Sequence, residues 1–186
     1  MSHLKLVSLN EIDELLSPEA IDNITINSPA TRVFTDFKYN QPLMIDSDVS
    51  IDEAERLMKA EHVKLKFVVN NQMKLLGVIA LEDINSQQIM KKMAQGLSRN
   101  ELYVNDFIKP LSAIKALEYS ELERTKIKDV VELLKENGHQ HCLVIDTGMH
   151  KVRGIISASD IARRLKIPMD LMYSKCMQKV EIILGF

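Results

Sequence analysis

Two short segments of this 186-residue chain carry the residues best suited to ligand binding. "GVIALEDI" begins at Gly77 and "GIISASDI" begins at Gly154, and an aspartate, Asp83 or Asp160, follows each glycine after the same interval. The second segment also has Ser157, at the point where a strand is expected to give way to a helix. A carboxylate can accept hydrogen bonds from both vicinal hydroxyls of a ribose. A serine hydroxyl beside the free N–H groups of a helix start can bind a phosphate.

Helix capping is the alternative explanation of the same residues. Ser157 followed by Asp160 fits a helix N-cap, with the hydroxyl accepting from a free amide and the carboxylate near the positive end of the helix dipole. The first segment keeps Asp83 but has Ala80, a poor N-cap residue, in place of the serine. It also has Glu82, and a further carboxylate disfavours a phosphate nearby. We therefore expect the Asp83 segment to form the weaker site, for a nucleoside without phosphates or for no ligand.

The elements that position these segments also occur twice. An apolar stripe at helical spacing precedes each segment, and strand-like runs flank each stripe. Ser50 with Glu53 predicts a capping box at the first helix, and Thr125 is expected to cap the second. The order strand–helix–strand–strand–helix is thus predicted in residues 33–90 and again in residues 104–166. The matching stripes are Ile51, Ala54, Leu57 and Met58 in the first copy and Ile127, Val130, Leu133 and Leu134 in the second.

One copy is too small to bury both faces of its sheet, so we expect the two copies to pack together about a pseudo-twofold axis. Two arms lie outside the copies. Residues 1–32 form an N-terminal arm with a short helix expected at 9–16, and residues 167–186 are expected to form a C-terminal helix. The apolar stripe of that helix fits packing on the chain's own core or a contact between subunits.

The duplicated unit resembles a tandem pair of cystathionine-β-synthase (CBS) domains over roughly residues 33–166. The resemblance implies an α+β fold of two pseudo-twofold related β-α-β-β-α repeats with two clefts between them. It also implies that one or both clefts bind an adenosine-containing ligand such as AMP, ADP, ATP or S-adenosylmethionine, without a required cofactor. Homodimers and an unknown effector protein are the implied partners, because the chain has no separate effector domain.

Carried onto this sequence, the family pattern assigns the ribose to Asp160 and the ribose or phosphate to Ser157. The partner copy is expected to complete each cleft. The residues implied for the stronger site are Asp160, Ser157, Ile155, Tyr39, Val63 and Lys64, and those for the weaker site are Asp83, Val78, His139 and Gln140.

Two lysines bear on the charge of the ligand. Strand alternation places Lys64 and Lys66 on one face, although the family usually has an apolar residue where Lys66 stands. In the cleft they would favour a polyphosphate, and in water they would only solubilise an edge strand. We expect Lys66 to face water and leave both interpretations open for Lys64.

Composition narrows the function classes. Apolar residues make up 46% of the chain and the net charge is −2, which indicates a globular protein without the basic surplus of a nucleic-acid binder. The most apolar run, Leu75 to Leu81, is too short to span a membrane. Cys142 and Cys176 give no disulfide framework, so a reduced, cytoplasmic location is expected.

Other functions have weaker support. His139 and His141 share a strand face, but no third ligand is spaced to complete a metal site. The stretch from Ser159 faintly resembles a helix-turn-helix, with Lys166 in place of the usual turn glycine. No set of residues for nucleophilic or acid–base catalysis can be assembled, so an enzyme is not expected. A ligand-free module for dimerisation or protein interaction remains the main alternative.

Overall fold

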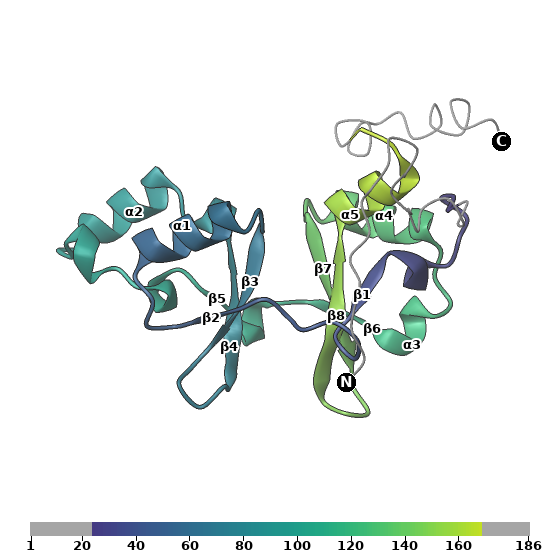
Figure 1. Ribbon diagram of the computed structural model, residues 1–186, viewed down its shortest axis with the longest axis horizontal. Helices are drawn as coiled ribbons and strands as arrows, with labels where there is room; N and C mark the ends of the chain where they lie inside the picture. The colour runs from purple at the N-terminus through teal and green to yellow at the C-terminus, as the bar shows by residue number, and fades with distance from the viewer. Residues whose placement is uncertain (1–23, 169–186) are drawn as a thin grey trace, which may run out of the picture.

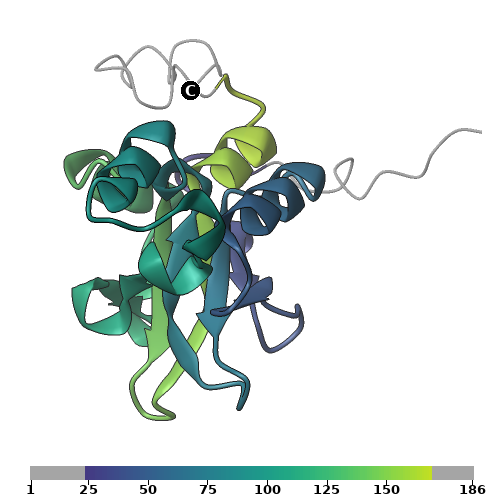
Figure 2. The same ribbon diagram turned by 90° about the vertical axis from the view of Figure 1, so that its left-hand side faces the viewer.

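The computed structural model describes residues 24–168 and shows two halves whose sheets face each other (Figure 1). Each half repeats one order of elements, and the β3–β4 and β7–β8 hairpins extend to the same end of the molecule (Figure 2). The first half contains β2 (Met44–Asp46), α1 (Ile51–Ala60), β3 (Leu65–Val69), β4 (Leu75–Ala80) and α2 (Ser86–Met93). The second contains β6 (Ala116–Glu118), α3 (Tyr119–Leu122), α4 (Ile127–Glu136), β7 (His141–Asp146), β8 (Lys151–Ser157) and α5 (Ala158–Leu165).

The α+β fold with two related repeats is confirmed. In each half the leading strand pairs in parallel with the next, β2 with β3 and β6 with β7, and an antiparallel hairpin follows. The predicted helix stripes supply buried core residues, Ile51, Ala54 and Met58 from α1 and Ile127, Val130 and Leu134 from α4. Leu57 and Leu133 lie at the margins of these stripes, and Leu133 is exposed.

Two further strands exchange between the halves. β1 (Phe34–Asp36) pairs antiparallel with β8, and β5 (Lys109–Pro110) pairs antiparallel with β4. The sheet orders are therefore β1-β8-β7-β6 and β2-β3-β4-β5. The sequence did not predict this exchange. It means that the start of the predicted segment 33–90 completes the sheet of the second half.

The segments that precede the exchanged strands also pack on the other half. Ile26, Ala30 and Val33, upstream of β1, lie in the hydrophobic core of the second half. Leu102 and Val104, upstream of β5, lie in the core of the first half. Each crossing segment thus contributes apolar burial as well as backbone hydrogen bonds, and both favour association of the halves.

A third hydrophobic cluster lies between the two sheets. Phe67, Val78 and Leu143 form its buried centre. Phe37, just after β1, packs edge-on against Phe67 with ring centroids 5.2 Å apart and planes at 87°, an orientation that aromatic pairs prefer. The expected packing of the repeats on one another is therefore present as an apolar seam.

An ion pair fixes the exchanged strand β1. Arg153 of β8 donates to both carboxylate oxygens of Asp36, at 2.8 and 2.9 Å, and both side chains are mostly buried. The guanidinium also lies 4.3 Å from the centre of the Tyr119 ring. Hydrogen bonding to Arg153 lowers the pKa of Asp36 below its usual value despite the opposing effect of burial. The pair therefore holds β1 on the second half through charge-assisted contacts.

The repeated glycines are explained by the exchange. A Cβ atom on Gly154 would lie closer than 3.0 Å to the Thr35 carbonyl oxygen and to the Phe34 ring. A Cβ on Gly77 would lie equally close to the Lys109 carbonyl oxygen. Glycine is therefore required where the other half's strand approaches the backbone of β4 or β8.

Parts of the predicted chain lie outside the described residues. These are the helix expected at 9–16, the C-terminal helix expected at 167–186 beyond Pro168, and the second helix of the helix-turn-helix hypothesis. α5, the first helix of that hypothesis, buries Ile161, Ala162 and Leu165 in the core of the second half. Each helix described within residues 24–168 is too short or too polar to span a bilayer.

We predict that Gly154→Ala lowers the free energy of unfolding by about 1–3 kcal/mol, because the carbonyl of Thr35 must move to admit the methyl group. Chemical denaturation followed by circular dichroism measures the change. Gly148→Ala is the matched control, since a Cβ there would meet only a side-chain oxygen of Asp146 at 3.4 Å. Equal stability of Gly154→Ala and wild type would show that the close approach does not constrain the fold.

Candidate nucleotide-binding clefts

A cavity of about 430 Å³ lies between the halves beside Asp160, and we call it the Asp160 cleft. β3, the end of α1 and the segment that follows β1 form one wall. β1, β7, β8 and the start of α5 form the other. Its lining residues are Thr35, Phe37, Gln41, Leu43, His62, Val63, Lys64, Leu65, Phe67, His141, Ile155, Ser157, Ser159 and Asp160. The strand exchange thus brings residues from both ends of the described chain to one hollow.

Most residues expected at the stronger site line this cleft. Asp160, Ser157 and Ile155 come from the second half, and Val63 and Lys64 come from the first. Tyr39 does not line it. It lies in the turn after β1, where its amide donates to the Asp36 carbonyl, and its side chain is 76% exposed with the Lys38 ammonium 5.4 Å from its ring.

Neighbouring residues take the place expected for Tyr39. Phe37, Gln41 and Leu43 lie on either side of the turn and line the cleft. Sequence analysis also missed His62 and His141 as lining residues. Side-chain alternation places Phe37 on the same face as Thr35 and could have predicted that Phe37 lines the cleft. That prediction required knowing that β1 crosses to the second half.

Ser157 occupies the N-cap position of α5 without capping the helix through its side chain. Its hydroxyl oxygen instead lies 2.6 Å from the hydroxyl of Ser159, and the residue is 8% exposed. Both serines line the Asp160 cleft, whereas the Ala158 amide at the start of α5 donates to the Gln140 carbonyl. A helix start with polar hydrogens directed at a cavity is suited to bind an anion.

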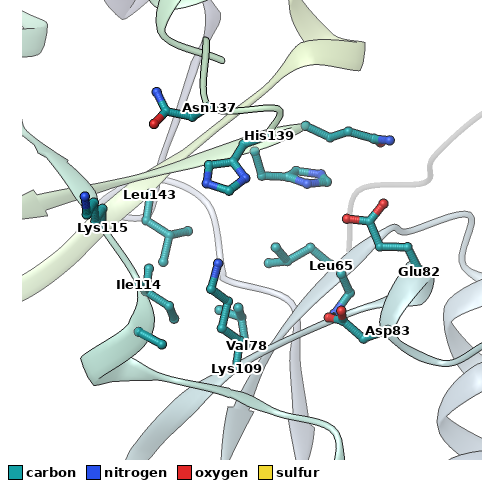
Figure 3. A pocket seen from close by; sticks show the side chains of 14 residues that line it. Leu65, Val78, Glu82, Asp83, Lys109, Ile114, Lys115, Asn137, His139 and Leu143 are labelled. Carbon is teal, nitrogen blue, oxygen red and sulfur yellow. The ribbon is translucent and has the colours of Figure 1, made fainter. Parts of the chain in front are cut away.

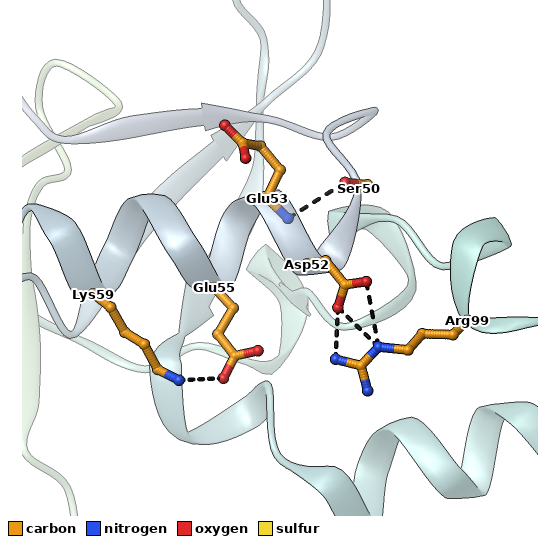
Figure 4. A network of polar contacts seen from close by, with 6 residues as sticks. All are labelled: Ser50, Asp52, Glu53, Glu55, Lys59 and Arg99. Carbon is orange, nitrogen blue, oxygen red and sulfur yellow. Dashed lines mark hydrogen bonds and ion pairs between the residues drawn. The ribbon is translucent and has the colours of Figure 1, made fainter.

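Ser50, by contrast, is a working cap. Its hydroxyl accepts from the Glu53 amide at 3.4 Å at the start of α1 (Figure 4). The Glu53 carboxylate pairs with Arg56 instead of returning to Ser50, so only one half of the predicted capping box forms. Thr125 was wrongly predicted as a cap, because its hydroxyl donates to the Glu121 carbonyl and α4 begins after Lys126.

Asp160 stands at the rim of the cleft. Its carboxylate accepts from the Arg163 guanidinium at 2.7 Å, and the side chain is 36% exposed. The second carboxylate oxygen remains available in geometry for further donors such as sugar hydroxyls. An exposed pair one helical turn apart is weak, so Arg163 can yield to a ligand at small cost.

Two nitrogen-bearing side chains, Lys64 and His141, also line the Asp160 cleft. Lys64 lines the cleft from the first half, and His141 lines it from β7. Burial lowers the pKa of His141, Lys64 lowers it further, and Asp160 opposes the shift. Burial therefore favours the neutral imidazole, and Lys64 is the basic side chain that the first half contributes to the site.

The expectation that Lys66 faces water is wrong. Lys66 is 5% exposed, and its ammonium lies 2.6 Å from the Glu61 carboxylate at the end of α1. It shares the strand face of Val68, which packs under α1, and the long side chain reaches the helix end for its partner. The departure from an apolar residue at this position is thus accommodated inside the first half.

A second cavity of about 290 Å³ lies beside Asp83, and we call it the Asp83 cleft (Figure 3). All the residues expected at the weaker site, Asp83, Val78, His139 and Gln140, line it. The Asp83 carboxylate accepts from the Ala80 amide at 3.0 Å and so caps the short 3-10 turn Leu81–Asp83. Capping therefore explains the retained aspartate of the first segment at least in part.

The two clefts are related position by position. His141 pairs with Ser157 as Leu65 pairs with Ala80, and Thr35 pairs with Ile155 as Lys109 pairs with Val78. His141 and Leu65 line both clefts, so the two cavities share a boundary. No group of three His, Cys, Asp or Glu side chains within residues 24–168 is arranged to hold a metal ion.

Comparison with known families identifies the repeats. The family model described as CBS domain matches residues 35–92 and 122–167. The chain belongs to the CBS domain family. The first match runs from the crossing strand β1 to α2, and the second covers α4, β7, β8 and α5 but begins after β6.

Similar proteins place the CBS pair in context. An uncharacterized 17.7 kDa protein of Acidianus ambivalens is 23% identical over 138 residues, which cover 74% of this chain and 76% of that protein. YlbB of Bacillus subtilis is 32% identical over 76 residues, 40% of this chain and 51% of YlbB. Among solved structures, an uncharacterized conserved protein from Pyrococcus horikoshii shares the fold with a TM-score of 0.55 and 21% identity, covering 75% of this chain and 93% of that one.

We predict that Ser157→Ala changes the free energy of unfolding by less than about 0.5 kcal/mol, because no side-chain cap is lost. Ser50→Ala is the matched comparison and should cost about 1 kcal/mol, since it removes a cap. Parallel denaturant titrations of the two variants measure the difference. A larger loss for Ser157→Ala than for Ser50→Ala would assign Ser157 to helix capping.

Proposed function

We propose that this protein is a non-catalytic regulatory CBS pair that binds an adenosine-containing ligand in the Asp160 cleft. The observation that carries the proposal is the composition of that cleft. A carboxylate, a serine hydroxyl not used in capping and the start of α5 stand at one end. An apolar slot with Phe37, Phe67 and Ile155 supplies a surface for a base.

Similar structures support this choice of ligand. CBSX2, crystallised in complex with AMP, shares 19% identity with a TM-score of 0.52 over 73% of this chain and 93% of that chain. The CBS pair of MJ0100 was crystallised with 5′-methylthioadenosine and S-adenosyl-L-methionine, at 19% identity and a TM-score of 0.50. Lys64 opposite Ser157 favours a ligand with phosphate over the uncharged or cationic alternatives.

The location of the cleft suggests how binding is read out. Each wall comes from a different half, so a bound ligand stabilises one arrangement of the two halves over others. A ligand shifts such an equilibrium only by its difference in affinity for the states. We infer that the protein acts in the cytoplasm. The arrangement that the ligand favours is then detected either by an effector protein or by a second copy of the chain in a homodimer.

A ligand-free interaction module is the second candidate, and the surface of α2 favours it. Met90 is 61% exposed and Met93 is 42% exposed, and only Ile89 of this helix is buried. α5, the corresponding helix of the second half, buries its apolar residues. Exposed methionines adapt readily to a protein partner. Under this hypothesis the two repeats act as a scaffold that presents the α2 surface to a protein partner.

A thermal-shift panel of AMP, ADP, ATP and S-adenosylmethionine separates the candidates. At a concentration one hundred times the Kd, a ligand of the native state adds about 2.7 kcal/mol, which raises the melting temperature by roughly 5–10 °C. We expect this rise in wild type with a phosphate-bearing ligand, its loss in Asp160→Ala and its retention in Asp83→Ala. No shift with any of the four compounds would favour the interaction module.

A further inference from the structure

The two clefts differ most where the exchanged strands enter them. Thr35 of β1 lies across from Ile155 in the Asp160 cleft, and Lys109 of β5 lies across from Val78 in the Asp83 cleft. Because Ile155 and Val78 occupy equivalent places in the two repeats, Thr35 and Lys109 are equivalent as well. A short hydroxyl side chain in one cleft is thus replaced by a long cationic one in the other.

Lys109 lines its cleft with an exposed side chain. Its ammonium group extends between the apolar residues Val78, Leu143 and Leu65 toward His139, whereas Lys115 lies at the edge (Figure 3). The remaining cavity measures about 290 Å³, against about 430 Å³ in the Asp160 cleft. Cavities that take nucleotide-sized ligands usually hold about 300–1,000 Å³.

A base in the Asp83 cleft would have to displace this ammonium or cover it. Covering it removes water from a charge that the base cannot pair, which is unfavourable. Cation–π attraction does not offset the loss, since it requires the ammonium above the ring and not in the place of the ring. The equivalent slot beside Thr35 holds no charge at that position.

The start of the helical turn in the Asp83 cleft is also altered. Ala80 supplies no hydroxyl, and Glu82 adds a carboxylate where the Asp160 cleft has Ser159. These two differences disfavour a phosphate, whereas Lys109 acts on the base. The Asp83 cleft therefore combines two separable obstacles to a nucleotide.

We propose that Lys109 is the residue that excludes the adenosine ligand from the Asp83 cleft, so that the pair binds one ligand per chain although it has two related cavities. The inference rests on the proposed function for the identity of the ligand, and it concerns the cleft that this function leaves empty. Lys109 acts as a specificity residue by occupying the place of the base.

The test transplants the residues of one cleft into the other in the full-length chain. Ala80→Ser with Glu82→Ser restores the hydroxyls and keeps Lys109. Adding Lys109→Thr introduces the residue found at the equivalent position 35. The matched control adds Lys115→Leu to the double variant instead of Lys109→Thr. It removes a lysine from the edge of the same cleft and introduces the leucine found at the equivalent position 43. Native mass spectrometry counts AMP molecules per chain, and circular dichroism verifies folding.

We expect one AMP per chain in wild type, in the double variant and in the Lys115→Leu control, and two in the variant with Lys109→Thr. With Asp160→Ala added throughout, the expected counts fall to one for the Lys109→Thr variant and none for the others. Two AMP molecules in the double variant that keeps Lys109, or no gain on Lys109→Thr in a folded protein, would overturn the inference.

The outcomes also separate this inference from the proposed function. If wild type binds no AMP, the proposed function fails for that ligand. The Lys109→Thr variant is still expected to gain one AMP over its parent, because the transplanted Asp83 cleft does not depend on Asp160. The absence of that gain would then contradict the role of Lys109 as well.

Discussion

The carbonyl of Thr35 lies so close to the backbone of β8 that residue 154 cannot carry a Cβ atom, and Lys109 imposes the same limit on residue 77. This close approach is the constraint on which the arrangement of the halves depends. It allows the exchanged strands β1 and β5 to pair with the sheet of the other half. The glycine that opens both repeated segments is therefore a requirement of strand exchange, independent of any ligand.

Both clefts are consequences of the exchange. β1 carries Thr35 into the Asp160 cleft, and the Asp36–Arg153 pair and the Phe37–Phe67 contact hold it there. A ligand in the Asp160 cleft would thus touch residues of both halves, whose relative positions depend on the contact between the halves. The Asp83 cleft arises from the equivalent exchange of β5, but its polar groups have other roles. Asp83 caps a 3-10 turn, and Lys109 extends its ammonium group into the cavity.

Local periodicity was sufficient to predict the repeats, since helix stripes and strand alternation depend on near neighbours. The family resemblance, and not periodicity, implied that Asp160, Ser157, Val63 and Lys64 share one cleft. All four line the Asp160 cleft, and their role in binding stays a prediction. Tyr39 and Lys66 were misplaced for non-local reasons. Tyr39 follows a strand whose crossing no local pattern reveals, and Lys66 finds Glu61 only after α1 packs on its sheet. Lys109 was missed because β5 is only two residues long.

The most direct test of this account is a set of backbone nuclear Overhauser effects in the full-length protein. Strand exchange predicts cross-strand contacts from Phe34–Asp36 to Gly154–Ile156, and from Lys109 to Val78, since antiparallel partners bring their backbone protons close together. Contacts of Phe34–Asp36 with the sheet of the first half alone, and none with β8, would contradict the exchange and the shared clefts that follow from it.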